Sequence, residues 1–111
     1  MDKSKRIAFE TAFAESLTAA LNNVNKGYNL ADNDKSKQLL SEAKRNIEDC
    51  FYWKDKNKLN VAIESIKLAF DDVHEAYLLT EGVYCYELVE YTSDAVDDLK
   101  HAYFNLTNLL N

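Results

Sequence analysis

Apolar side chains recur along this chain in steps of three and four residues, the spacing of one face of an α-helix. One series lies within residues 4–26 and a second within residues 34–54. A third runs from residue 59 to residue 79, and a fourth follows the Thr-Glu-Gly at 80–82. No alternating apolar and polar run reaches five residues, so we expect no β-strand. The pattern therefore predicts an all-α fold with four helices.

These four series define the expected core. Its members are Phe9, Phe13, Leu17, Ala20, Val24, Leu39 or Leu40, Ala43, Ile47, Cys50, Leu59, Ala62, Ile63, Ile66, Phe70, Val73, Tyr77, Tyr84, Leu88, Tyr91, Ala95, Leu99, Ala102, Leu106 and Leu109. Amphipathic helices joined by short connections bury such stripes against one another. We therefore expect an antiparallel four-helix bundle with a long C-terminal helix, built as a single domain over residues 1–111.

The ends of the helices are predicted from turn and capping residues. Gly27 should end the first helix, and the Asn and Asp residues within 29–34 suit a loop and the N-cap of the second. The expected connections are residues 27–34, 55–58 and 80–82. The fourth helix, counted from Tyr84, is either one rod of about 28 residues and roughly 42 Å, or two helices if Thr-Ser-Asp at 92–94 caps a new start.

Composition agrees with a helical domain. The 111 residues include no Pro and only two Gly, whereas a sheet protein of this size needs several turn residues. Hydrophobic residues make up 47% of the chain, which is enough apolar surface to order one core. The first residues lack the apolar run of a signal peptide, and no segment approaches the roughly 20 apolar residues of a membrane span. We therefore expect a cytoplasmic protein that does not enter a membrane.

Charge divides the chain into two unlike halves. Residues 1–58 hold eleven Lys or Arg against nine Asp or Glu, a net charge of +2. Residues 59–111 hold two against ten, a net charge of −8. The second half therefore predicts attraction to a basic partner, while the Lys54, Lys56 and Lys58 cluster of the first half could pair with a second copy.

Several large apolar residues lie off the core stripes. At about 100° per residue, Phe51 and Trp53 flank the stripe of the second helix and can bury their edges, whereas Tyr52 points away from it. The off-stripe residues of the third and fourth helices are Val61, Leu68, Leu79, Tyr86 and Phe104. Because Tyr and Trp are enriched at binding hot spots, Tyr52, Trp53 and these five residues are candidates for protein contact. Trp53 could instead close the end of the bundle.

The fourth helix also has an apolar arc wider than one helix seam needs. The residues that widen it are Cys85, Val89, Val96, Tyr103 and Leu110. Packing within the chain could absorb them, but the chain supplies only three other helices. We therefore expect a homodimer in which a second copy covers this arc.

Carboxylates form a row along one side of the fourth helix. Its members are Glu87, Glu90, Asp94, Asp97 and Asp98. Same-sign neighbours at such spacings cost a few tenths of a kcal/mol each. The row is either a solvated face or a contact for a basic protein surface. Direct nucleic-acid binding is disfavoured by the net negative charge, but the row could mimic DNA phosphates and block a basic groove of a nucleic-acid-binding protein.

Catalytic and metal-binding patterns have little support. His74 and His101 each follow an Asp three residues earlier, a spacing related to the Glu-x-x-His of di-metal bundles. Those sites also need inward carboxylates from the other two helices, which the first two stripes lack. Cys50 and Cys85 lie on or near apolar faces, and neither has a His in helical register. We expect no enzyme activity, no cofactor and reduced cysteines, with a metal-binding bundle as a minor alternative.

In size, charge and architecture the chain is similar to the small acidic helical antagonists found among phage proteins, immunity proteins and antitoxins. That general resemblance implies a non-enzymatic protein that binds a larger target by surface contact. We therefore interpret the chain as a protein-binding inhibitor or adaptor that uses the outer faces of its third and fourth helices.

Overall fold

The computed structural model describes residues 1–110, which form four helices and contain no strand. The helices are α1 (Lys3–Leu30), α2 (Asp34–Asp55), α3 (Leu59–Leu78) and α4 (Tyr86–Asn108). The all-α prediction is therefore confirmed, and each predicted helix is present.

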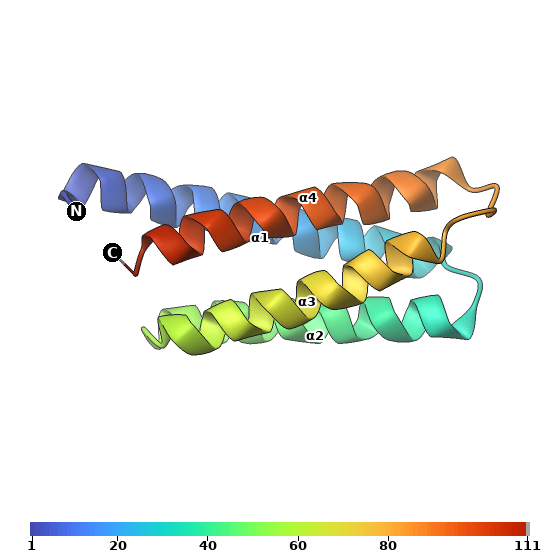
Figure 1. The fold of residues 1–111 in the computed structure, drawn as a ribbon, viewed down its shortest axis with the longest axis horizontal. Helices are drawn as coiled ribbons and strands as arrows, with labels where there is room; N and C mark the ends of the chain where they lie inside the picture. Colours follow the sequence, from blue (N-terminus) through green and yellow to red (C-terminus); the bar gives the residue numbers. More distant parts are fainter. Residues whose placement is uncertain (111) are drawn as a thin grey trace.

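Successive helices run in opposite directions and form an elongated bundle with extents of 47 × 20 × 17 Å (Figure 1). The closest pairs are α1 with α4 and α2 with α3, and they lie as two layers. The α3–α4 seam is looser, and the α1–α2 seam is looser still. Both chain ends lie at the same end of the bundle as the α2–α3 turn, while the α1–α2 and α3–α4 connections lie at the other.

The core lies along the bundle axis and is built from the predicted stripes. Leu17, Ile47, Ile66 and Leu99, one from each helix, are at most 1% exposed. Burying each such side chain contributes about 1.5–3 kcal/mol. Phe9, Leu59, Phe70 and Tyr77 only flank this core. The prediction that Tyr84 is a core residue is wrong: it is fully exposed, because it lies in the connection before α4.

Side-chain caps begin the first two helices. The Asn33 side-chain oxygen accepts a hydrogen bond from the backbone N–H of Ser36 at 2.7 Å, as predicted for an Asx residue there. Asp2 accepts one from the backbone N–H of Lys5 at 2.8 Å. These caps satisfy amide groups that have no partner within the helix.

The prediction that Gly27 ends α1 is wrong, because α1 continues to Leu30. Gly27 is buried within the helix, where a Cβ atom would lie 3.5 Å from Leu40 and 3.8 Å from both Leu88 and Thr92. Its carbonyl accepts the N–H of Ala31, whose extended backbone ends the helix. Gly27 thus faces a crossing of three helices rather than a turn.

The predicted alternative of a break at residues 92–94 is also wrong, since α4 is continuous from Tyr86 to Asn108. The buried Thr92 hydroxyl donates back to the carbonyl of Leu88 at 2.9 Å and therefore does not cap a new helix. The helix has 23 residues, fewer than the 28 expected, because it starts two residues after Tyr84 and ends at Asn108. The α3–α4 connection is correspondingly longer than predicted.

We predict that Gly27→Ala stabilises the protein by about 0.5–1 kcal/mol, because Ala loses less conformational freedom in a helix interior and its methyl group makes ordinary contacts here. The free energy of unfolding in urea measures this. Gly82→Ala is the matched control and should destabilise by about 1 kcal/mol, because Gly82 has a φ of 81°. Destabilisation by Gly27→Ala would show that the three-helix crossing has no room for a methyl group.

Candidate protein-binding surfaces

The structure exposes most of the candidate contact residues. Tyr52, Val61, Leu68, Leu79, Tyr86 and Phe104 are all exposed, and so are Glu87, Glu90, Asp94 and Asp97. Trp53 is only partly buried and packs against the core. The outward orientation expected from the helical pattern is therefore confirmed for the ten exposed residues.

The row of three rings at the end of α2 divides as predicted. Phe51 and Trp53 are partly buried against the core, while Tyr52 is 54% exposed. The Phe51 ring meets Phe13 edge-on at 6.2 Å, and Trp53 meets Tyr52 edge-on at 5.0 Å. Lys56 lies 5.5 Å from the centre of the Tyr52 ring. Trp53 therefore helps to close this end of the bundle, and Tyr52 is the ring that faces solvent.

The candidate residues do not form one surface. Tyr52, Trp53 and Val61 lie at the end of the bundle that carries the termini, whereas Leu79 and Tyr86 lie at the opposite end. Leu68 lies midway along α3, and the helical repeat places it on the side nearest α2. The sequence pattern identified outward residues but not which of them are neighbours.

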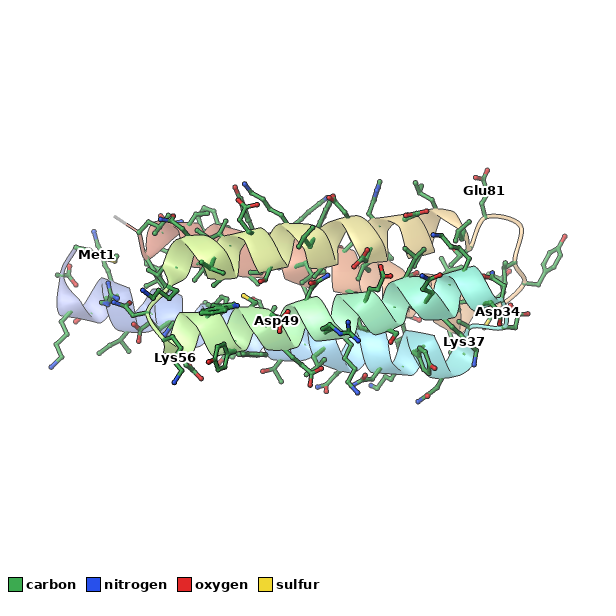
Figure 2. The ribbon with its side chains drawn as sticks, turned by 90° about the horizontal axis from the view of Figure 1, so that it is seen from below. Met1, Asp34, Lys37, Asp49, Lys56 and Glu81 are labelled. Atoms are coloured by element: carbon green, nitrogen blue, oxygen red, sulfur yellow. The ribbon has the colours of Figure 1, made fainter. Side chains whose placement is uncertain are left out.

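The end with the α3–α4 connection, which we call the acidic tip, combines exposed rings with carboxylates. Tyr84 is 101% exposed and Tyr86 is 91% exposed. Exposed companions at this end are Leu78, Leu79, Glu75, Glu81, Glu87 and Glu90, and Figure 2 shows Glu81 directed into solvent. Residues 68–99 hold nine carboxylates and no Lys or Arg. Sequence reasoning missed Tyr84 as a surface residue because it fits the apolar spacing of α4.

Two carboxylates of the acidic half hold helices together. Asp98, a member of the predicted row, accepts a hydrogen bond from Asn23 of α1 at 2.8 Å. Asp72 accepts one from Asn46 of α2 at 3.1 Å. Each close helix pair therefore has one Asn–Asp link between its helices. Burial raises the pKa of Asp98, although the hydrogen bond from Asn23 lowers it.

Burial also raises the pKa of Asp72 from 3.8 to about 6. The nearby carboxylate of Glu42 raises it further, and the hydrogen bond from Asn46 lowers it. Asp71 and Glu75 on the same helix add smaller upward contributions. Deprotonated Asp72 is therefore held in surroundings that disfavour its charge.

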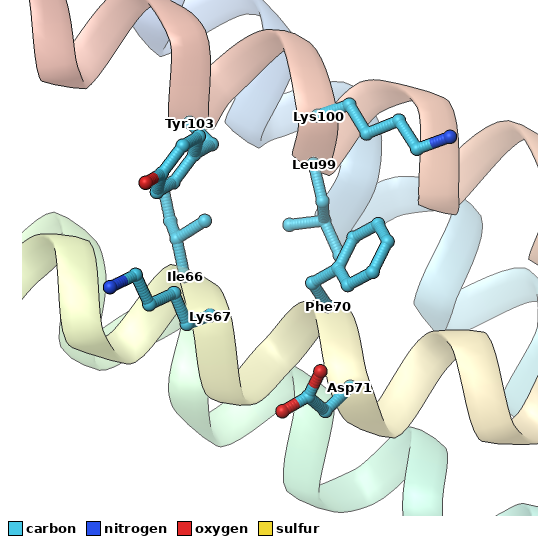
Figure 3. A pocket seen from close by; sticks show the side chains of 7 residues that line it. All are labelled: Ile66, Lys67, Phe70, Asp71, Leu99, Lys100 and Tyr103. Atoms are coloured by element: carbon cyan, nitrogen blue, oxygen red, sulfur yellow. The ribbon is translucent and has the colours of Figure 1, made fainter.

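A shallow groove of about 360 Å³ follows the α3–α4 seam (Figure 3). Its apolar lining consists of Ile66 and Phe70 from α3 with Leu99 and Tyr103 from α4. Its polar lining is Lys67, Asp71 and Lys100. Lys67 and Lys100 are the only two cations of residues 59–111, so both cations of the acidic half lie on one groove.

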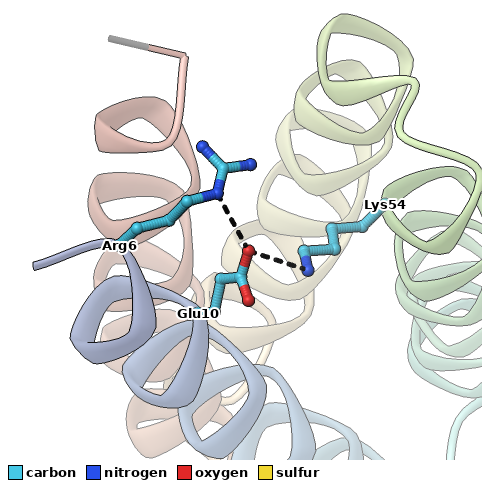
Figure 4. Close-up of polar contacts among 3 residues, drawn as sticks. All are labelled: Arg6, Glu10 and Lys54. Carbon is cyan, nitrogen blue, oxygen red and sulfur yellow. Dashed lines mark ion pairs between the residues drawn. The ribbon is translucent and has the colours of Figure 1, made fainter. Parts of the chain in front are cut away.

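The opposite end of the bundle, which we call the basic end, gathers cations from two separate segments. Lys3, Lys5 and Arg6 come from the start of α1, Lys54 from the last turn of α2, and Lys56 and Lys58 from the α2–α3 turn. Glu10 joins the two segments, because its carboxylate lies 3.4 Å from Arg6 and 3.8 Å from Lys54 (Figure 4). Cations also lie at the other end of the bundle, because Lys26 is near the end of α1 and Lys35 and Lys37 are near the start of α2 (Figure 2).

The histidines and cysteines of the chain differ in exposure. His74 and His101 are both exposed, and His74 stacks on Phe70 at 5.7 Å. Both cysteines are free, and burial raises the pKa of the Cys50 thiol to about 12. Within residues 1–110, no group of three or more His, Cys, Asp or Glu side chains is placed to hold a metal ion. None of the helices described is long and apolar enough to cross a membrane.

Comparison with protein-family models, curated proteins and solved structures gave no significant match. Function therefore has to be inferred from the surfaces of this chain.

We predict that Asp72→Asn makes the protein more stable at about pH 7 and that this gain shrinks as the pH falls through about 6 towards 4. In this range folded Asp72 binds a proton more readily than the unfolded chain does, so the wild type gains stability on acidification and the variant lacks that gain. The amide oxygen that the substitution introduces can still accept the hydrogen bond from Asn46. Urea unfolding across this pH range measures the difference.

Asp55→Asn, at an exposed position, is the control for the loss of one negative charge. A gain from Asp72→Asn that does not change with pH would contradict the raised pKa of Asp72.

Proposed function

We propose that this protein is a cytoplasmic, non-enzymatic binding module that attaches to a basic protein surface through its acidic tip. One observation carries the proposal: Tyr84 and Tyr86 are almost fully exposed within a segment of nine carboxylates that contains no cation. The two free cysteines are in keeping with a reducing compartment. As a small module that covers part of a larger surface, it would act as an antagonist or an adaptor, and we propose that it does so as a homodimer.

The exposed rings contribute little to the fold, since neither lies among the core residues or those packed against them. A large stiff side chain gives contact area at a low cost in entropy, which is why Tyr is enriched at binding hot spots. Leu78 and Leu79 add exposed apolar surface beside them. The acidic tip thus offers an apolar centre that a partner can bury.

The carboxylates around these rings favour a cationic partner. Glu81, Glu87 and Glu90 are exposed. Charged residues at the rim of an interface mainly raise the association rate and exclude partners of the same sign. A partner with an apolar cleft bordered by Lys and Arg fits this surface.

The decisive test compares capture by the wild type with capture by a Tyr84→Ala/Tyr86→Ala variant, using quantitative mass spectrometry on lysate of the source organism. A protein held by the wild type should be lost with the variant. Tyr52→Ala is the matched control, because Tyr52 is an exposed ring at the opposite end of the bundle. With the captured protein purified, the double variant should bind at least about tenfold more weakly.

Equal capture by the wild type and the double variant would contradict a site at the acidic tip. The salt dependence of binding distinguishes this proposal from the rival function, in which the carboxylates alone mimic DNA phosphates. Binding anchored by the rings should persist as sodium chloride is raised to about 0.3 M, whereas a phosphate mimic should lose most of its affinity.

A further inference from the structure

The α3–α4 groove carries a self-complementary charge pattern on its α3 side. Glu64, Lys67, Asp71 and His74 follow one another in steps of three, four and three, so they form one stripe on the helix surface. Lys67 and Asp71 line the groove, and Glu64 and His74 are exposed on either side of them. Along the stripe, carboxylates therefore alternate with groups that can donate a hydrogen bond.

A stripe with this order of charges is complementary to the same stripe of a second copy that runs in the opposite direction. When two copies meet face to face with α3 antiparallel to α3, a two-fold axis near residue 69 brings Lys67 of each copy opposite Asp71 of the other. The same axis brings Glu64 of each copy opposite His74 of the other. All four positions then meet a partner of suitable chemistry, as an isologous interface requires. Lys67, which lies 3.3 Å from Glu64 of its own chain, would then lie between that carboxylate and Asp71 of the other copy.

The α4 side of the groove obeys the same two-fold relation. Lys100 and Tyr103 are three residues apart and both line the groove, so Lys100 of one copy comes opposite the Tyr103 ring of the other. A cation over an aromatic face is a favourable contact. Within residues 1–110, Lys100 forms no ion pair in its own chain, which leaves it available for this contact.

The charges at the two ends of α3 favour the antiparallel direction of pairing. In a parallel pair, two acidic tips would lie side by side and repel each other. In the antiparallel pair, Lys56 and Lys58 at the basic end of one copy lie opposite Glu81 of the other, because these residues are at similar distances from residue 69 along the chain. The two-fold axis places this contact between opposite charges at both ends of the dimer.

The apolar surface and the size of the face suit a dimer. Ile66, Phe70, Leu99 and Tyr103 line the centre of the groove, and Leu78 and Leu110 are exposed towards its two ends. The face runs the length of α3, whose 20 residues span about 30 Å at 1.5 Å per residue.

We propose that two copies of this chain form an antiparallel homodimer through the α3–α4 groove, with Lys67 of each copy paired to Asp71 of the other. Of the predicted apolar arc of α4, Val96 is already buried in the core and Cys85 packs against it, so the dimer covers the exposed Tyr103 and Leu110 and leaves one acidic tip at each end. This dimer rests on the proposed function, because it gives the binding module two acidic tips. Its interface uses other residues than the acidic tip, so dimerisation and partner binding can fail independently.

The test uses charge reversal and sedimentation equilibrium. Asp71→Lys alone places two ammonium groups opposite each other across the interface, and Lys67→Asp alone places two carboxylates opposite each other. Each variant should therefore dimerise at least about tenfold more weakly than the wild type. An equimolar mixture of the two variants restores opposite-charge pairing in the mixed dimer and should dimerise more strongly than either variant alone. Far-UV circular dichroism of each variant checks that the helices are retained.

Asp49→Lys is the matched control, because Asp49 is exposed on α2, away from the groove (Figure 2). It should leave dimerisation unchanged. Wild-type protein that stays monomeric at about 100 μM would overturn the proposal. Dimers of Asp71→Lys as stable as the wild type would also overturn it.

A mixture of Asp71→Lys with Lys100→Asp distinguishes the two directions. If that mixture recovers dimerisation and the mixture with Lys67→Asp does not, the pairing is parallel and the proposed arrangement is wrong. The Tyr84→Ala/Tyr86→Ala variant should dimerise normally, so a failure of partner binding and a failure of dimerisation can be told apart.

Discussion

Repulsion among the carboxylates of α3 and α4 is the constraint on which the rest of this molecule depends. Residues 59–111 carry ten acidic side chains and two cations, and the fold places the two helices that contain most of them side by side. Each like-charged neighbour costs a few tenths of a kcal/mol. Burial of the four apolar stripes has to offset that cost, and the looser α3–α4 seam is where it acts most directly.

The fold reduces the repulsion in two ways. Asp98 and Asp72 are tied by hydrogen bonds to Asn23 and Asn46 on the neighbouring helices, so these two carboxylates also hold the close helix pairs together. The only cations of the acidic half lie on the groove between α3 and α4. Neither the Asn–Asp hydrogen bonds nor these two cations lie at the acidic tip, where Glu81, Glu87 and Glu90 remain exposed beside two exposed tyrosines. Lys26, Lys35 and Lys37 lie at this end on α1 and α2, and the proposed cationic partner would add positive charge beside the carboxylates of α3 and α4.

The sequence predicted most of the fold because the apolar periodicity is long and regular in all four helices. The prediction was wrong where one local feature of the sequence is compatible with two different structures. Gly27 looked like a helix end, but it is a close contact among three helices. Tyr84 matched the spacing of α4, although the chain before Tyr86 is not helical. The helical repeat gave the outward direction of Tyr52 and Phe104, whereas their distance from the acidic tip depends on the direction of each helix in the bundle.

The measurement that tests this account most directly is the stability of the free protein against salt. Raising sodium chloride from about 10 mM to about 500 mM shortens the Debye length severalfold and screens exposed charges. If unbalanced carboxylates limit stability, the urea midpoint of unfolding should rise with salt. A midpoint that stays constant or falls would show that the charges are already balanced within the chain, and the case for a cationic partner at the acidic tip would then be lost.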